Sequence, residues 1–258
     1  MPAVTFVSDA HLGGGSPAVE AAKERDLVAF LDALPSGDAL YLLGDLFDFW
    51  FDFGAPPPPA YGPVLRALER ATRRGVRIAF MGGNHDFWAR TLRRPGYLER
   101  EIGLALIGDP CPVTLQGMRL FLTHGDALGG SEGAYRFVRG VLRSPAAIRA
   151  FRILPQRLGY WLAARTSAVS RERHDEAARV RHRDALRAQA LATLAAGGWD
   201  AVIAGHVHHP ERIVTENGVY LNLGDWIEHR TYGRLCEGRL TLETFEPFEP
   251  RHEKSGTR

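Results

Sequence analysis

Short, largely apolar runs recur along the chain, and each is followed by glycine, histidine, aspartate or asparagine. They are rich in valine, isoleucine, leucine and phenylalanine and occupy residues 3–7, 39–43, 76–81, 118–122, 200–204 and 218–223. Between the first three runs, apolar residues recur at helical spacing: Leu27, Phe30, Leu31 and Leu34, then Val64, Leu65, Leu68 and Ala71. Apolar strands that alternate with helices predict a layered α/β architecture.

The polar residues that follow these strands are the candidate functional residues. They are Asp9 and His11, Asp45, Asn84 with His85 and Asp86, His124, and His206 with His208. Ligands of α/β sheets bind beyond the carboxyl ends of the strands, so we expect these side chains to gather at one edge. Any single motif is also compatible with a structural turn, because glycine, asparagine and aspartate are common turn residues.

A long arginine-rich segment separates the fourth motif from the fifth. Residues 133–171 contain no aspartate or glutamate, and they carry Arg136, Arg139, Arg143, Arg149, Arg152, Arg157, Arg165 and Arg171 among apolar residues. We predict an inserted helical cap over about 130–195, in which a charged, alanine-rich helix from about residue 172 to 194 returns to the sheet. Two interpretations stay open. The helices pack their apolar side against the core and expose the arginines to solvent, or the segment forms a surface that binds a ligand both acidic and hydrophobic.

The amino-acid composition limits which classes of protein this chain can belong to. A chain of 258 residues, 45% hydrophobic and 24% charged, can bury a full core, and we predict one domain over 1–245 with a flexible tail at 246–258. The net charge of +2 does not favour nucleic acid. Two cysteines are too few for a disulfide framework or a zinc–thiolate site, and no run of eighteen apolar residues or signal sequence is evident. We expect a cytoplasmic protein that can lie peripherally on a membrane.

The candidate residues are typical metal ligands. Asp9, His11, Asp45, Asn84, His124, His206 and His208 offer oxygen and imidazole donors without thiolate, which suits Mn²⁺, Fe or Zn²⁺, with Mn²⁺ favoured by the oxygen donors. Seven ligands exceed one tetrahedral ion but suit two ions bridged by Asp45. Such a pair, roughly 3.5–4 Å apart, hydrolyses phosphate esters or diphosphates. The pairs at i and i+2 would address one centre or two adjacent centres if the backbone stays extended.

The order of the motifs resembles a known superfamily. D-x-H at Asp9 and His11, GD at residues 44–45, GNHD at 83–86, HGD at 124–126 and GHxH at 205–208 are similar to the signature of the calcineurin-like metallophosphoesterases. The resemblance implies a four-layer α/β/β/α sandwich with a dinuclear centre. It also implies that Asp9, His11, Asp45 and His208 hold one ion, and that Asp45, Asn84, His124 and His206 hold the other.

Within that superfamily, SDAHLG, LLGDLFDFWF, GHVHHP and NLGDW are similar to the UDP-2,3-diacylglucosamine diphosphatases of lipid A biosynthesis. This resemblance implies hydrolysis of an anionic nucleotide-linked lipid to the lipid 1-phosphate and UMP, with the acyl chains in the cap. It implies contact with the cytoplasmic face of the inner membrane. The expected substrate-binding residues are Asn84, Arg149, Arg157, Arg165 and Arg171.

One residue departs from that subfamily, whose best-known members have arginine where this chain has His85. We expect His85 to be catalytic, donating a proton to the leaving oxygen or stabilising its charge, and Asp86 to orient its ring. Asp48 and Asp126 either orient metal ligands or are turn residues. Another phosphodiester, nucleotide or lipid diphosphate substrate remains an alternative, as do a non-catalytic scaffold and a nuclease.

The aromatic residues near the second strand invite a ligand-stacking interpretation. Phe47, Phe49, Trp50, Phe51 and Phe53 follow its carboxyl end. An aromatic cluster beside a strand end is more often core, and core is our prediction.

Overall fold

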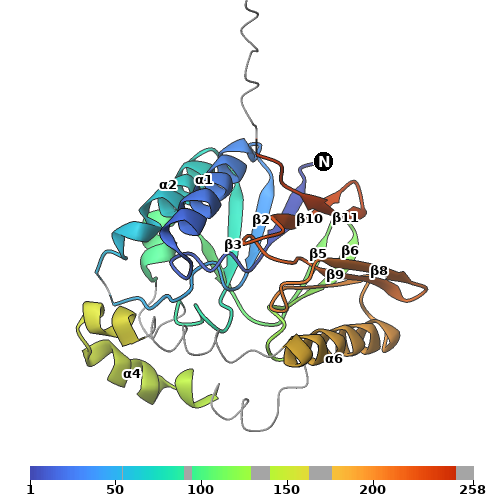
Figure 1. Cartoon of the computed structure of the whole chain (residues 1–258). Coiled ribbons are helices and arrows are strands. Elements are labelled where there is room, and N and C mark those ends of the chain that lie inside the picture. Colours follow the sequence, from blue (N-terminus) through green and yellow to red (C-terminus); the bar gives the residue numbers. More distant parts are fainter. Residues whose placement is uncertain (54, 90–94, 129–139, 163–175, 248–258) are drawn as a thin grey trace, which may run out of the picture.

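The computed structural model describes residues 1–53, 55–89, 95–128, 140–162 and 176–247, which build two facing β-sheets with helices outside them (Figure 1). The first sheet has the strand order β11-β10-β1-β2-β3-β4. Its strands are β1 (Val4–Val7), β2 (Ala39–Leu43), β3 (Arg77–Met81), β4 (Ala105–Ile107), β10 (Thr231–Cys236) and β11 (Arg239–Thr244). The strands β1 to β4 run parallel, and β10 joins β1 antiparallel.

The second sheet has the order β5-β6-β7-β9-β8. Its strands are β5 (Cys111–Leu115), β6 (Met118–Leu122), β7 (Ala201–Ala204), β8 (Glu211–Thr215) and β9 (Gly218–Asn222). The central strands β6, β7 and β9 are parallel, whereas β5 and β8 pair antiparallel at the two edges. All six apolar runs of the sequence are therefore strands, and each sheet contributes parallel strands whose carboxyl ends carry the motifs.

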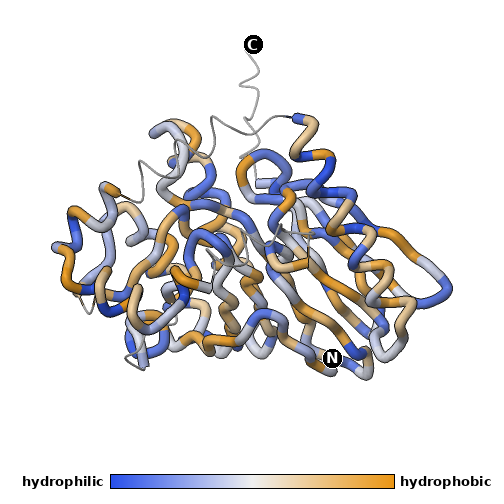
Figure 2. Tube along the Cα trace, turned by 90° about the horizontal axis from the view of Figure 1, so that it is seen from below, coloured by the Kyte–Doolittle hydropathy of each residue, from blue (hydrophilic) through white to orange (hydrophobic). Residues whose placement is uncertain are grey.

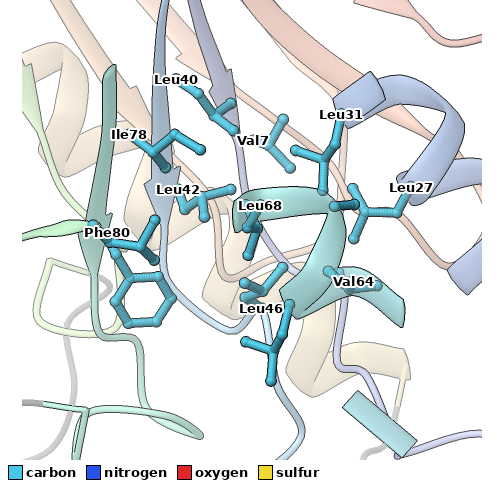
Figure 3. Close-up of a cluster of buried hydrophobic side chains, with 14 of the residues drawn as sticks. Val7, Leu27, Leu31, Leu40, Leu42, Leu46, Val64, Leu68, Ile78 and Phe80 are labelled. Carbon is cyan, nitrogen blue, oxygen red and sulfur yellow. The ribbon is translucent and has the colours of Figure 1, made fainter. Parts of the chain in front are cut away.

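Helices α1 (Pro17–Ala33) and α2 (Gly62–Arg73) cover the outer face of the first sheet. Pro17 stands in the first turn of α1, where its missing N–H costs nothing, and Pro35 disfavours helical geometry at Leu34, where the helix stops. The predicted apolar positions of both helices are buried against the sheet, as Figure 3 shows for Leu27, Leu31 and Val64. Each such side chain contributes about 1.5–3 kcal/mol through its burial.

Two further hydrophobic clusters complete the layers. Phe6, Leu43 and Met81 of the first sheet pack against Leu122 and Ile203 of the second. Helix α6 (Glu176–Ala195) packs its buried side chains Leu186, Ala190 and Leu194 on the outer face of the second sheet. Figure 2 shows the hydrophobic stretches running along the strands. The predicted four-layer α/β/β/α sandwich is confirmed.

The described part of the arginine-rich segment contains α4 (Pro145–Ile153) and a helical stretch at residues 156–162. Ser144 caps α4, because its hydroxyl accepts a hydrogen bond from the N–H of Ala147 at 3.2 Å. In Figure 1, α4 lies apart from α6, beyond the carboxyl ends of the first sheet's strands. Among the described residues, no helix is long and apolar enough to cross a membrane.

Candidate metal centre

The seven candidate ligands converge from both sheets. Asp9, Asp45 and Asn84 follow β1, β2 and β3 of the first sheet, and His124 and His206 follow β6 and β7 of the second. Parallel strands present their carboxyl ends at the same edge, so facing sheets of this kind bring ligands together from two sides. Those five residues, with His11 and His208, form one polar cluster, in which Asp9, His11, Asp45 and His124 are buried and Asn84, His206 and His208 are half-buried.

The backbone at this cluster is unusual. Asp9, His11, Asp45, His206 and His208 all have positive φ angles, of 55°, 43°, 53°, 73° and 52°. Only eight described non-glycine residues have positive φ, so most of them are candidate ligands. The extended geometry on which the i, i+2 argument depended is therefore absent at both pairs. Left-handed backbone at non-glycine residues costs about 1–3 kcal/mol each and concentrates at functional sites.

One group of ligands surrounds Asp9. Its Oδ1 lies 3.3 Å from Nε2 of His208 and 3.7 Å from Nε2 of His11, and the two imidazole nitrogens are 3.1 Å apart. Nε2 of His11 is also 3.5 Å from Oδ2 of Asp45. These four residues are those that the resemblance assigns to the first ion.

The other group surrounds His124. Its Nε2 lies 2.9 Å from Oδ1 of Asn84 and 3.4 Å from Oδ2 of Asp45, and the His206 ring lies edge-on to it, with ring centroids 5.1 Å apart. Nδ1 of His124 is 2.9 Å from the carbonyl oxygen of Leu43. A carbonyl only accepts, so Nδ1 carries the proton and Nε2 is available as a ligand. Asp45 lies between the two groups, since its Oδ2 approaches both His11 and His124.

Glycines allow this crowding. A Cβ at Gly83 or at Gly205 would collide with the carboxylate of Asp45 or of Asp9, respectively. At Gly44, whose φ is +90°, a Cβ would collide with the His124 ring. The glycines that precede Asn84, His206 and Asp45 are thus required by close approach to ligand side chains.

The charges of the cluster fit divalent cations. Burial opposes protonation of His11, but the nearby carboxylates of Asp48 and Asp9 raise its pKa to about 10. Burial acts the same way on His124, whose pKa is nonetheless raised well above its usual value by Asp45. Oδ1 of Asp9 is buried and has no hydrogen-bond partner. The carboxylates thus create a strong negative potential, and Oδ1 of Asp9 has a lone pair that is free to coordinate. A bound cation would neutralise the negative charge, accept that lone pair and keep the imidazoles in the neutral form that binds metals.

His206 behaves differently from those two histidines. Burial and the neighbouring His124 lower its pKa to about 4. A neutral imidazole is the form that binds a metal, so this residue is ready as a ligand at neutral pH.

Three groups of side chains have ligand atoms close enough to share an ion: Asp9, His11 and His208; Asp9, Asp45 and His124; and His11, Asp48 and His85. The chain has a divalent-metal site.

His85 lies at the rim of this site, but Asp86, its expected partner, does not contact its ring. Its ring is edge-on to His11 at 4.6 Å, and its Nδ1 is 3.0 Å from the backbone oxygen of Asp48 and 3.6 Å from Oδ1 of the same residue. Asp86 instead accepts hydrogen bonds from the backbone N–H groups of Gly83, Asp45 and Phe47, at 2.8, 3.1 and 3.2 Å. The expectation that Asp86 orients the His85 ring is wrong, because its oxygens are engaged beneath the loops. Asp48 contacts that ring.

Burial raises the pKa of Asp86 to about 7, and the nearby charge of Asp45 adds to this effect. The residue ties together the loops that follow β2 and β3. Its position indicates a structural task in holding Asp45 and Asn84 in place. The GNHD motif alone did not show this structural role, because an aspartate next to a histidine in sequence suggests that the two side chains interact.

The four described arginines of the arginine-rich segment divide into two sets. Arg149 and Arg157 are exposed, and Arg165 and Arg171 lie outside the described residues. Two arginines that we did not predict as site residues reach the body of the protein. Arg152 donates to the backbone oxygen of Asp52 at 3.2 Å, and Arg143 donates to the backbone oxygen of Gly83 at 3.0 Å. Nothing in the local sequence distinguishes Arg143 and Arg152 from the other arginines, because all of them lie in the same arginine-rich, apolar segment.

The core prediction for the aromatic residues after β2 holds for three of the five. Phe47, Trp50 and Phe51 are buried, whereas Phe49 and Phe53 are half-buried. Phe51 and Trp88 form a small cluster with Ile148 of α4, against which Phe49, Phe53, Phe87 and Phe151 pack. The cluster joins the cap to the loops after β2 and β3, so it lies between the metal centre and the cap.

A buried lysine was also missed. Lys23 of α1 is 2% exposed, and its Nζ donates to the backbone oxygen of His11 at 2.7 Å and to Glu20 at 2.8 Å. Glu20 accepts hydrogen bonds from the N–H groups of Gly13 and Gly15. Together Lys23 and Glu20 hold the loop that carries His11. The rarity of lysine in an arginine-rich chain is the only sequence signal that could have drawn attention to it.

Comparisons with known proteins agree with this geometry. Residues 2–210 match the family described as "Calcineurin-like phosphoesterase". A UDP-2,3-diacylglucosamine hydrolase of Xanthomonas campestris pv. campestris (strain B100) is 33% identical over 248 residues, covering 92% of this chain and 97% of that protein. A protein of the same name from Stenotrophomonas maltophilia (strain R551-3) is 34% identical over 251 residues, covering 93% and 97%. A solved archaeal phosphodiesterase, with a TM-score of 0.45 and 13% identity over 93% of this chain and 98% of its own, is too distant to add to the assignment.

The four layers and the histidine–carboxylate cluster define a metal-dependent phosphoesterase. More specifically, the chain belongs to the calcineurin-like phosphoesterase family. This membership confirms the resemblance seen in the five motifs.

Proposed function

We propose that the protein hydrolyses the diphosphate of UDP-2,3-diacylglucosamine, yielding the lipid 1-phosphate and UMP, with two divalent ions of which Mn²⁺ is the best candidate. The observation that carries the proposal is similarity over almost the whole chain, cap region included, to proteins named as hydrolases of that compound. A chain that shared only the phosphoesterase core would leave the substrate open. Here the alignment extends over 92–93% of the chain.

The ligand assignment supports two ions. Asp9, His11 and His208 would hold the first, and Asn84, His124 and His206 the second, with Asp45 shared between them. Two bound ions would polarise the phosphoryl group, activate a water molecule and offset charge on the entering and leaving oxygens. Both cysteines lie on strands, in β5 and β10, and belong to neither ligand group, so oxygen and imidazole donors would select the metal.

His85 would exchange the proton of the reaction. Its Nδ1 lies near the carbonyl oxygen of Asp48, which only accepts, so Nδ1 donates and Nε2 is left to act on the substrate. Asp48 also lies 3.7 Å from His11, so one carboxylate orients both the proposed acid and a proposed metal ligand. Asn84 would contact the phosphoryl oxygens as well as the second ion.

The cap would hold the lipid. The half-buried side chains of Phe49, Phe53 and Phe151, which pack against the buried cluster of Phe51, Trp88 and Ile148, would provide apolar surface for the lipid, and Arg149 and Arg157 would provide positive charge. We keep Arg165 and Arg171 as further candidates for the anionic groups. Apolar surface next to positive charge is what an acylated diphosphate requires.

An assay of UMP release from UDP-2,3-diacylglucosamine tests the proposal. We expect release that depends on Mn²⁺, is abolished by a chelator and is restored by added metal. The D45N variant is the matched negative control, because it keeps the size of the side chain and removes the shared charge. Mn²⁺-dependent hydrolysis of bis(p-nitrophenyl) phosphate without any release of UMP would reject this substrate while keeping the reaction class.

The cap also supports peripheral contact with a membrane at the cytoplasmic face. Six large apolar side chains of the described part of this segment are exposed, among them Ile153 at 84%, Trp161 at 53% and Leu158 at 41%, and exposed Arg149 and Arg157 accompany them. Such a surface favours anionic lipid headgroups. We expect co-sedimentation with phosphatidylglycerol vesicles that the I153S/W161S variant loses. V214S, which removes a 61% exposed valine on β8, is the control and should bind as the wild type does.

A further inference from the structure

Arg143 of the cap contacts three groups in the metal-binding body of the protein. The Nη2 atom of Arg143 donates to the backbone oxygen of Gly83 at 3.0 Å and lies 3.7 Å from Oδ2 of Asp126. Its guanidinium also lies over the Phe87 ring, 4.9 Å from the ring centroid. The side chain is 26% exposed, whereas that of Asp126 is fully buried. A partly desolvated ion pair with a planar fork is a well-defined contact.

Two of these contacts lie beside proposed ligands of the second ion. Gly83 immediately precedes Asn84, and Asp126 follows His124 by two residues. Asn84 and His124 are themselves joined by the 2.9 Å contact between Oδ1 and Nε2. One guanidinium therefore spans two loops, from different sheets, that meet at the same ion site.

We propose that Arg143 is a positioning residue for the second metal ion, bridging the loops that carry Asn84 and His124 so that this half of the centre depends on the cap. The proposal rests on the two-ion function proposed above. Arg143 acts through the backbone at Gly83 and the carboxylate of Asp126, and it is not itself a ligand. Cations near a metal site repel the ion, but here the charge is balanced by the buried Asp126.

The proposed bridge between the two loops depends on the planar guanidinium group of arginine. A guanidinium presents donors in a rigid plane and can satisfy a carbonyl and a carboxylate together while stacking on Phe87, whereas an ammonium is a point charge on a flexible stem. Loss of such an outer contact typically weakens metal affinity about 10–100-fold. The contacts of Arg143 with Gly83, Asp126 and Phe87 do not involve Asp9, His11 or His208, the proposed ligands of the first ion.

Titration of the metal-free protein with Mn²⁺ tests the proposal without any substrate. Calorimetry gives the two dissociation constants, and the EPR signal of a spin-coupled Mn²⁺ pair reports whether both sites are filled. We expect R143M to bind one ion as the wild type does and the other about 10–100-fold more weakly, with loss of the coupled signal at low Mn²⁺. R143K should fall in between, and it carries the test if R143M is unstable.

Two variants separate the bridge from general docking of the cap. W88F removes the indole donor that bonds the backbone oxygen of Leu142 at 3.0 Å, and R152M removes another arginine that contacts the body. Both should keep two wild-type affinities. Unchanged affinities in R143M, or an equal loss in W88F, would overturn the inference.

The same titration separates this inference from the proposed function. A wild-type protein that binds a single ion would overturn both proposals. Two ions in the wild type, weakened binding in R143M and no hydrolysis of the lipid substrate would overturn the substrate assignment alone.

Discussion

A methyl group at Gly83 would test whether Asp45 has to lie where the structure places it. An ideal Cβ at this position would be 2.7 Å from the backbone nitrogen of Asp45 and would overlap its Oδ1. Gly83 is not among the glycines with positive φ, so alanine can adopt its backbone conformation. The G83A substitution is therefore a purely steric perturbation of the proposed bridging carboxylate.

The size of the effect follows from the distances. Atoms in ordinary contact are about 3.5–4.0 Å apart, so Asp45 or the loop has to move by about 0.8 Å or more. A misplacement of about 1 Å at a catalytic group costs roughly 10²-fold in rate, or about 2.7 kcal/mol. The displaced Oδ1 also accepts the N–H of His85 at 2.8 Å, and loss of a hydrogen bond to a charged group costs about 1.5–3 kcal/mol of stability.

The assay compares G83A with the wild type in kcat, bound metal and Tm. We expect kcat to fall roughly 10²-fold, and Tm to fall by about 2–4 °C for each kcal/mol lost in a protein of this size. G140A is the matched control, because a Cβ at Gly140 has nothing within 4 Å. A G83A protein with wild-type kcat and full metal content would refute the reasoning that Asp45 is held as a shared ligand.

Four further changes have defined outcomes. D45N should lower kcat by about 10³-fold or more and reduce bound metal, measured by mass spectrometry, since its carboxylate lies between both groups; retention of both ions would argue against a shared ligand. K23M should lower the free energy of unfolding by about 1.5–3 kcal/mol in urea, because it removes charged donors to the His11 loop, and K23R should recover part of it. D86N should destabilise the protein by about 1–3 kcal/mol by disturbing three backbone hydrogen bonds; an unchanged urea midpoint would contradict this. The pKa of His11 is raised to about 10 in the folded protein, so its contribution to the stability of the metal-free form is complete below pH 6.5 and is lost as the pH rises toward 10; H11Q should flatten that decline in the urea midpoint.

The strands that carry the ligands were predictable, because their information is local. Runs such as residues 39–43 and 201–204 are apolar on both faces and end in glycine and a polar residue, which marks a buried parallel strand and the loop after it. Strands β5 and β8 were missed, although both alternate between half-buried and exposed residues as edge strands do. Strand β10 was also missed, and it pairs with β1 from the opposite end of the chain.

The ligand residues were predictable for a related reason. Each metal-binding motif is a short string, so its donors are visible without the fold. The backbone conformation at Asp9, His11 and Asp45 was not visible, because left-handed φ angles at non-glycine residues are imposed by surrounding contacts and not by local preference. The partner of Asp86 was predicted wrongly for the same reason, since its three donors come from two different loops.

The sequence by itself determined the layered α/β class, the identity of the donors and the position of a basic, apolar insertion. Only the tertiary structure decided that Asp45 lies between two ligand groups, that Asp48 and not Asp86 contacts His85, and that Arg143 of the cap reaches the loops of Asn84 and His124. The physical reason is that hydrophobic periodicity is read along a few neighbouring residues. Contacts between loops of two facing sheets depend instead on how both sheets pack, and the four described arginines of the arginine-rich segment become distinguishable only after that packing exists.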